Sequence, residues 1–423
     1  MSSLNPNTNR PETIGPGQTR WLSIVGIGEE GIDGLGELAR GLIESAEIVF
    51  GGSRHLALAA SLIRGTARVW ASPFDAAAAE VLAHRGRSVC VLASGDPFQH
   101  GIGSVLARHV TPDETIAIPA VSAFSLVASR LLWPLPETTL LSLCGRSLDF
   151  IRPHLQPGAR IIALTSGATA PAAIAELLCA AGFGDSQITV LEALGGPRER
   201  VRSTRAIEFN FDPIAALNTV AIEVVADATA RIVSRAPGRA DELFEHDGQI
   251  TKREIRALTL SALAPRRGER LWDVGAGSGS VAIEWMLADP SLSAIAIERR
   301  SDRAARIRHN AAAFGVPDLQ VLEADAPQAL QGLQPPDAVF IGGGTTTPGM
   351  IETAQAALRI HGRLVINAVT LDTEAVLLST HARHGGNLLR VEIQRAGPIG
   401  GEAARSLGWR PAMPITQWTW VKR

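Results

Sequence analysis

Short apolar runs alternate with helical or small-residue segments through the first half of the chain. Such an alternation predicts βαβ units, with mainly parallel sheets that are covered on both faces. The predicted strands span residues 22–25, 48–50, 88–92, 115–118, 140–143, 161–164, 188–191 and 220–225. This set of strands leaves room for two small α/β lobes.

The second half continues the alternation and adds a glycine-rich loop. The apolar run at residues 271–274 is followed by Gly275, Gly277 and Gly279, and the helical spacing of residues 280–288 predicts a helix that begins at this loop. Further strands are predicted at residues 294–297, 319–322, 337–341, 363–368, 388–393 and 416–421, and further helices at 252–263, 350–358 and 372–382. These elements predict an α/β domain with a seven-stranded sheet.

The length of 423 residues predicts more than one domain. Residues 1–20 are polar and rich in Pro, Gly and Asn, so we expect a disordered tail there. We predict a two-lobed domain at 21–234, with its lobes divided near residue 118, then a linker at 235–248 and a second domain at 249–423. The linker is predicted because Pro, Gly and charged residues are mixed there, between the last strand of one half and the first helix of the next.

Composition excludes several classes of protein. The formal net charge of −2 gives no general basic field, which disfavours a nucleic-acid binder. No apolar stretch reaches the roughly 20 residues that a membrane helix needs, so we expect no membrane partner. The 3 cysteines lack C-x-x-C spacing, which predicts no metal site and no disulfide framework, and a reducing cytoplasm follows.

The glycine spacing restricts the ligand of the loop. A dinucleotide fingerprint is G-x-G-x-x-G, but here the third glycine comes one position early and Ser280 stands in its place. This spacing disfavours an NAD-dependent dehydrogenase. The next apolar run ends in Glu298, whose carboxylate can accept hydrogen bonds from both hydroxyls of a ribose. The first N–H groups of the helix at 280–288, which begins at the glycine loop, favour an anion.

The D-x-G-x-G-x-G pattern resembles motif I of the methyltransferases that depend on S-adenosylmethionine (SAM). The resemblance implies that Asp325 lies where the adenine amine is recognised, and that the helix before the glycine loop covers the cofactor. Thr251 is predicted as the N-cap of that helix, with Glu254 three positions on, and as a cofactor contact. The cofactor-binding residues implied for this half are Thr251, Asp273, Gly275, Ala276, Gly277, Ser278, Gly279, Glu298, Asp325 and Ala326.

Three glycine-bearing or serine-bearing turns mark the first half: VGIGEEG at 25–31, SGDPFQHGIG at 94–103 and PAVSAF at 119–124. In this order they resemble the tetrapyrrole (corrin and porphyrin) methylases, which bind SAM between two α/β lobes. The first turn satisfies G-x-G-x-x-G, but the strand at 48–50 ends in glycines instead of the acid that a dinucleotide site needs. The resemblance implies a SAM pocket lined by Ser94, Gly95, Asp96, Ser122 and Ala123.

Other motifs resemble the precorrin-methylating branch of these enzymes. They are GGSRHL at 51–56, with Arg54 and His55, and Cys144-Gly145-Arg146, where the branch more often has His-Gly-Arg. In the second half, ITKREIRALTLSALAP, LWDVGAGSGS and FIGGG resemble the decarboxylating precorrin carbon-15 methyltransferases. The glycines at 342–344 leave space for a large planar substrate. Arg54, His55, Arg146, Arg395 and Arg405 are candidates to bind substrate carboxylates, and Arg395, Arg405 and Arg410 lie around the last predicted hairpin.

The order of the two halves resembles fused, bifunctional precorrin methyltransferases. The resemblance implies an N-terminal tetrapyrrole methylase fold and a C-terminal Rossmann-like SAM methyltransferase fold. It also implies one SAM for each domain, no metal, methylation of a precorrin at carbon-5 and carbon-15, and decarboxylation of the ring-C acetate in corrin biosynthesis. We expect a homo-oligomer through the C-terminal domain. Two alternatives stay open: a SAM methyltransferase acting on RNA or another metabolite, and a SAM-binding scaffold with one inactive domain.

Overall fold

The computed structural model describes residues 20–70, 74–398 and 406–423, without the side chains of residues 74–77. The predicted disordered tail lies outside the described residues, except for Arg20. The described chain divides into two compact units. Unit 1 ends at Thr229 and leaves out the segment Arg146–Gln156, which groups with unit 2, Ala230–Arg423. The sequence pattern gave no sign that this short segment belongs with the second unit.

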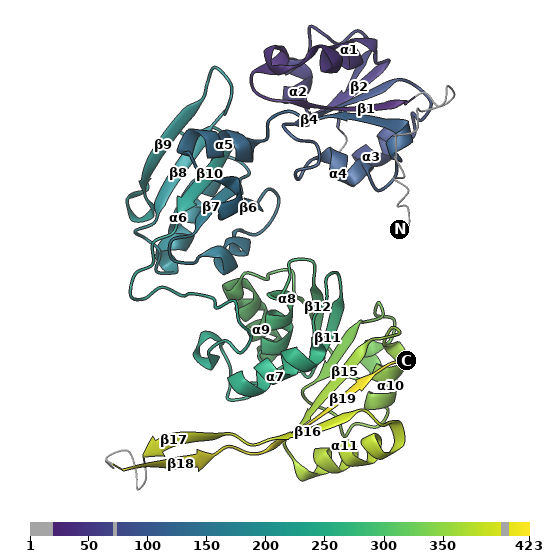
Figure 1. Ribbon diagram of the computed structural model, residues 1–423, viewed down its shortest axis with the longest axis vertical. Helices are drawn as coiled ribbons and strands as arrows, with labels where there is room; N and C mark the ends of the chain where they lie inside the picture. Colours follow the sequence, from purple (N-terminus) through teal and green to yellow (C-terminus); the bar gives the residue numbers. More distant parts are fainter. Residues whose placement is uncertain (1–19, 71–73, 399–405) are drawn as a thin grey trace, which may run out of the picture. The chain divides into compact units, whose positions relative to one another are not determined.

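The first lobe of unit 1 is a parallel sheet between two layers of helices (Figure 1). Its sheet order is β3-β2-β4-β1-β5, and all of its strand pairs are parallel. The elements are β1 (Leu22–Ile27), α1 (Glu37–Ser45), β2 (Ile48–Gly51), α2 (Ser53–Leu58), β3 (Thr66–Val69), α3 (Phe74–Leu82), β4 (Val89–Ser94), α4 (Ile102–Leu106) and β5 (Thr115–Ile118). Every residue of β1 is buried, because α1 and α2 pack on one face while α3 and α4 pack on the other.

The second lobe has a mixed sheet in the order β6-β7-β10-β8-β9. Only β6 and β7 are parallel, whereas β10 runs antiparallel to β7 and β8, and β9 runs antiparallel to β8. The elements are α5 (Ala123–Leu131), β6 (Thr138–Ser142), β7 (Arg160–Leu164), α6 (Ala170–Ala180), β8 (Gln187–Glu192), β9 (Arg200–Arg205) and β10 (Asn218–Glu223). The prediction of a mainly parallel sheet is therefore wrong for this lobe. Its last strands are joined by loops instead of crossover helices, and antiparallel pairing then follows.

Unit 2 is built on a seven-stranded sheet in the order β13-β12-β11-β14-β15-β19-β16. The strands are β11 (Arg270–Val274), β12 (Ser293–Glu298), β13 (Gln320–Glu323), β14 (Ala338–Ile341), β15 (Arg363–Ala368), β16 (Asn387–Val391) and β19 (Ile415–Val421). The helices are α7 (Arg253–Leu263), α8 (Ser280–Met286), α9 (Ser301–Phe314), α10 (Met350–Ala357) and α11 (Leu371–His384). The helices α7 to α9 cover one face of the sheet, and α10 and α11 cover the other (Figure 1). The predicted α/β class and seven-stranded sheet are confirmed.

A two-stranded hairpin extends from unit 2. It consists of β17 (Gln394–Pro398) and β18 (Leu407–Pro411), which pair with each other and not with the seven-stranded sheet (Figure 1). Leu407 and Trp409 on this hairpin are 69% and 72% exposed. The hairpin therefore presents apolar side chains outside the core of its own unit.

Candidate functional site

The central cavity of unit 2 lies where the strand order of the sheet reverses. β11 and β14 are neighbours there, and helices follow them on opposite faces, which is the arrangement that leaves a crevice at the carboxyl ends of parallel strands. The loops after these two strands touch. A Cβ on Gly275 would lie 2.9 Å from the backbone nitrogen of Gly343, and Gly275 has φ of +71°. Glycine is needed at 275 for both reasons.

Two buried acids lie beneath this loop. Glu298 is 4% exposed and accepts hydrogen bonds from the backbone N–H groups of Gly277 (2.9 Å) and Arg300 (3.1 Å). Asp273 accepts one from Ala282 (3.0 Å) in the first turn of α8. Burial raises the pKa of Asp273 to about 7, and the negative charge of Glu298 acts in the same direction. Asp273 thus braces the loop and α8, and Glu298 faces the cavity.

The cavity has a volume of about 830 Å³ and gathers most of the predicted cofactor residues of this half. Those on its wall are Thr251, Gly275, Ala276, Gly277, Glu298, Asp325 and Ala326. Asp273, Ser278 and Gly279 are not on the wall. Gly279 is instead the N-cap of α8, and a Cβ there would lie 2.7 Å from the side chain of Ile307. These three residues support the loop from behind.

The predicted N-cap role of Thr251 is wrong. The N-cap of α7 is Lys252, which makes no side-chain cap hydrogen bond. The carbonyl of Thr251 instead accepts a hydrogen bond from Arg256, at 2.5 Å. Glu254 completes no capping box, because its carboxylate binds Arg395 of the hairpin. Thr251 therefore lies on the cavity wall, and the buried Arg256 holds its backbone in place.

That arginine belongs to a buried ionic network under α7. Arg256 is fully buried and donates to Glu284 (2.7 Å), to Asp241 (3.1 Å) and to the carbonyl of Arg239. Glu284 also accepts hydrogen bonds from the backbone N–H groups of Gly238 (2.7 Å) and Arg239 (2.9 Å). The network therefore fastens the chain before α7 to α8 and fixes the cavity wall.

The arginines proposed for substrate carboxylates lie in different places. Arg395 lines the cavity of unit 2, with its charge paired to Glu254. Arg410 donates to the carbonyl of Pro398 on the hairpin, and Arg405 lies outside the described residues. Arg146 lines neither cavity: it stacks on Phe150, 3.8 Å from the ring centroid, and lies 3.8 Å from Asp318.

Sequence patterns did not single out Asn367, which lines the cavity at the end of β15. Its amide donates to Thr259 Oγ1 (2.9 Å) and accepts from Gln417 Nε2 (2.9 Å), its register partner on β19. This network joins a helix and two strands that are far apart in sequence. A polar residue at the carboxyl end of a buried strand was the only available signal.

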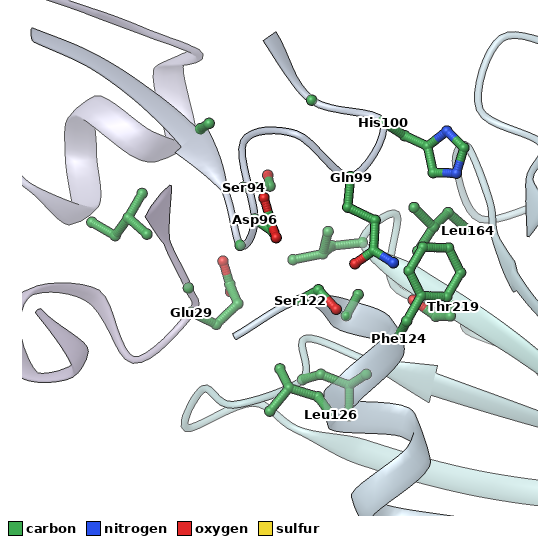
Figure 2. Close-up of a pocket in the computed structure, with 18 of the residues that line it drawn as sticks. Glu29, Ser94, Asp96, Gln99, His100, Ser122, Phe124, Leu126, Leu164 and Thr219 are labelled. Atoms are coloured by element: carbon green, nitrogen blue, oxygen red, sulfur yellow. The ribbon is translucent and has the colours of Figure 1, made fainter. Parts of the chain in front are cut away.

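Unit 1 holds a second cavity, of about 400 Å³, whose wall comes from both lobes. Figure 2 shows Ser94 at the end of β4, Asp96 on the loop that follows, and Ser122 with Phe124 at the start of α5. All five predicted cofactor residues of this half lie on the wall: Ser94, Gly95, Asp96, Ser122 and Ala123.

The turns that carry these residues are packed tightly. A Cβ on Gly26 would lie 2.0 Å from the carbonyl oxygen of Gly95, and one on Gly95, which has φ of +53°, would lie 2.9 Å from the carbonyl of Val121. Ser122 caps α5 by accepting a hydrogen bond from the backbone N–H of Ser125 (3.2 Å). The glycines thus allow three turns to meet at one point.

Arg54 and His55 also lie on the wall, together with Glu29, which sequence patterns did not single out. Arg54 donates to Glu29 and to Ser94 Oγ (2.8 Å), and His55 Nε2 lies 2.7 Å from Ser94 Oγ. Burial lowers the pKa of His55 to about 4, and the charge of Arg54 adds to this effect. His55 is therefore neutral near pH 7, which does not suit the predicted role of binding a carboxylate.

Cys144 lines the cavity of unit 1 and donates through its thiol to the carbonyl of Thr165, at 3.3 Å. The exposed thiol at this position has no disulfide partner, and neither has Cys90 or Cys179. Among the described side chains, no group of three His, Cys, Asp or Glu residues is placed to hold a metal ion. Within the same part of the chain, the helices include none with the length and apolar character to cross a membrane.

Two family models match the chain, and each lies mainly within one unit. That of the tetrapyrrole (corrin/porphyrin) methylases matches residues 22–209, and that of the precorrin methyltransferase domain matches residues 242–422. The two folds and their cavities, with these matches, define a two-domain methyltransferase.

Relatives extend the match along nearly the whole chain. A precorrin-6Y C(5,15)-methyltransferase (decarboxylating) from Sinorhizobium sp. is 57% identical over 416 residues, covering 98% of this chain and 99% of the relative. One of the same name from Mycobacterium tuberculosis is 41% identical over 407 residues, covering 95% and 100%. A cobalt-precorrin-6B C(15)-methyltransferase (decarboxylating) from Salmonella typhimurium is 35% identical over 167 residues, covering 38% and 85%. The chain belongs to the family of the precorrin-6Y C(5,15)-methyltransferases (decarboxylating).

Proposed function

We propose that this chain methylates a precorrin at carbon-5 in unit 1 and at carbon-15 in unit 2, and removes the ring-C acetate carboxyl group as carbon dioxide. The reaction belongs to the formation of the corrin ring of cobalamin. The observation that carries the proposal is the presence of two separate cavities, each built on close-packed turns, in a chain matched from end to end by a C(5,15)-methyltransferase.

One SAM for each unit supplies an electrophilic methyl group on a sulfonium. In unit 2, Gly275 to Gly277 present backbone to the ligand, and Glu298 offers its carboxylate to the ribose hydroxyls. In unit 1, the turns at Ser94–Asp96 and Ser122–Ala123 contact SAM, and their backbone arrangement differs from that of the glycine loop in unit 2. The nucleophile is an electron-rich ring carbon of the substrate, so these residues act chiefly by holding two reactants in line.

The wall of the larger cavity leaves room for the substrate of the decarboxylation. Gly342, Gly343 and Gly344 follow β14 without side chains and leave room for a flat macrocycle. Loss of carbon dioxide breaks one carbon–carbon bond, and the electron pair passes into the conjugated ring, which then takes a proton. We assign no acid or base of unit 2 to that proton.

Mass spectrometry of an incubation with precorrin-6Y and SAM tests the proposal. We expect a product with two more methyl groups and one fewer carboxyl group than the substrate. A product with a single added methyl group, or with the carboxyl group retained, would contradict it.

We also propose a homo-oligomer through unit 2, in the cytoplasm. The exposed apolar residues Leu407 and Trp409 on the hairpin support association, and the three unpaired cysteines support a reducing compartment. Light scattering on the full chain measures the oligomeric state. We expect a mass above the 44.6 kDa of one chain, and a mass closer to that of one chain in Trp409→Glu.

A further inference from the structure

Three polar side chains meet at the wall of the cavity in unit 1. The same guanidinium nitrogen of Arg54 lies 2.8 Å from Ser94 Oγ and 2.9 Å from His55 Nε2, and those two atoms are 2.7 Å apart. Arg54 is held in turn by Glu29, whose side chain is 7% exposed and also lies 3.7 Å from Arg198. A serine and a neutral histidine are thus fixed in contact beside the cavity.

The positions of the protons follow from the chemistry of these groups. An arginine only donates, so His55 Nε2 must accept, and in a neutral ring the proton then lies on Nδ1. Nδ1 is buried and has no hydrogen-bond partner among the described residues. Ser94 Oγ accepts from Arg54, and its 2.7 Å contact with the unprotonated Nε2 directs its own proton to that nitrogen, whose single lone pair the Arg54 and Ser94 donors share. A remaining lone pair of Ser94 Oγ is available to the cavity, where Figure 2 shows the side chain.

Methylation of a bridging ring carbon that still carries hydrogen requires a proton acceptor. The new carbon–carbon bond forms as the sulfur–methyl bond breaks, and the hydrogen on that carbon leaves as a proton to restore conjugation. We propose that Ser94 and His55 form the relay that takes this proton: Ser94 Oγ accepts it from carbon-5 while passing its own proton to His55 Nε2. His55 returns the proton to solvent when the product leaves. This inference rests on the proposed methylation at carbon-5.

The electrostatics of the cluster suit such a relay. The lowered pKa of His55, about 4, keeps its Nε2 unprotonated at neutral pH, so the acceptor is ready before each turnover. Arg54 opposes the imidazolium that the relay creates, whereas Glu29 stabilises it. A weak base suffices, because the methylated intermediate is a cation and its carbon-bound proton is acidic.

The test uses the full chain with His55→Asn and Ser94→Ala, and precorrin-6Y that carries hydrogen or deuterium at carbon-5. Loss of a general base lowers the rate by about 100-fold to 10,000-fold, so we expect kcat for carbon-5 methylation to fall by at least about 100-fold in each variant. Proton removal becomes rate-limiting, so a primary deuterium isotope effect should appear that is larger than in the wild type. A merely structural role of His55 would not change this isotope effect.

Two controls accompany the test. His109→Asn changes an exposed histidine of the same unit and should retain the wild-type rate. Carbon-15 methylation in the same molecules reports that the chain has folded.

Three outcomes separate the possibilities. Wild-type kcat with no new isotope effect in both variants would overturn the relay while leaving the proposed function intact. The relay would also be overturned if carbon-5 methylation were lost in Asp96→Asn and retained in the His55 and Ser94 variants; Asp96 is, with Glu29, an acid on this wall. Absence of carbon-5 methylation in the wild type would instead overturn the proposed function itself.

Discussion

At the scale of single residues, burial decides whether the role predicted from the sequence fits the cavity. Glu298 was predicted from its place at the end of an apolar run, and it lies on the cavity wall with both oxygens bonded to backbone. His55 was predicted as a carboxylate ligand, but a neutral imidazole fits a proton acceptor better. The difference arises because the sequence does not show how deeply a histidine is buried or which cation lies beside it.

Glu298→Gln should weaken SAM binding in unit 2 by about 10-fold to 100-fold. An amide has one accepting oxygen in place of two, and a hydrogen bond to a charged group contributes about 1.5–3 kcal/mol. Glu323→Gln is a matched control, since Glu323 is the register partner of Glu298 on β13 and is exposed. Calorimetric titration with SAM measures both variants, and equal affinity in the two would refute the role of Glu298.

Asp273 makes the stability of unit 2 depend on pH. Its pKa is about 7 in the folded chain against an ordinary 3.8, so between pH 4 and 7 the folded state keeps a proton that the unfolded state has released. This group therefore removes stability as pH rises through that window, at no more than about 1.4 kcal/mol per pH unit. Asp273→Asn removes the titrating group.

Urea unfolding, followed by the fluorescence of the buried Trp272 and Trp285, tests this expectation. The free energy of unfolding of Asp273→Asn, minus that of the wild type, should increase steadily from pH 4 to pH 7. A constant difference between the two proteins across this range would show that Asp273 does not titrate there.

At the scale of elements, apolar runs located the buried strands and missed exposed strands that carry no such run. The strands β5 and β15 begin and end where predicted, and β2 differs by one residue. The strand β3 is exposed along its length, and β9, with the sequence RVRSTR, alternates between exposed and half-buried positions. Both were missed because an edge strand with polar residues carries no apolar run. Sheet direction in the second lobe was likewise hidden, because it depends on connections and not on strand sequence.

The glycine loop after β11 allows a direct test at this scale. Gly275→Ala forces a Cβ against the backbone of Gly343, whereas Gly268→Ala, at a similar φ of +80°, meets no atom within 4 Å. The control should cost about 1–2 kcal/mol from its left-handed backbone alone. Gly275→Ala should cost more, and it should also weaken SAM binding in unit 2. Similar losses of stability, with binding intact in both, would contradict the close approach of the two loops.

At the scale of the whole molecule, the chain carries two unrelated α/β architectures, each with a cavity at the carboxyl ends of strands. The glycine motifs were visible in the sequence because they are local. Glu29 and Asn367 were not visible, because their partners Arg54 and Thr259 lie on other elements. Motifs formed by neighbouring residues could therefore be predicted from the sequence. The residues that complete each cavity through contacts between elements could be found only from the structure.

We propose that each unit binds its own methyl donor. Isothermal titration calorimetry of the full chain with SAM measures this most directly, with Glu298→Gln as the companion. We predict two molecules of SAM for each wild-type chain, and in the variant one site that keeps its Kd while the other weakens. A single molecule for each wild-type chain, or weakening of both sites in the variant, would contradict separate binding of SAM by the two units.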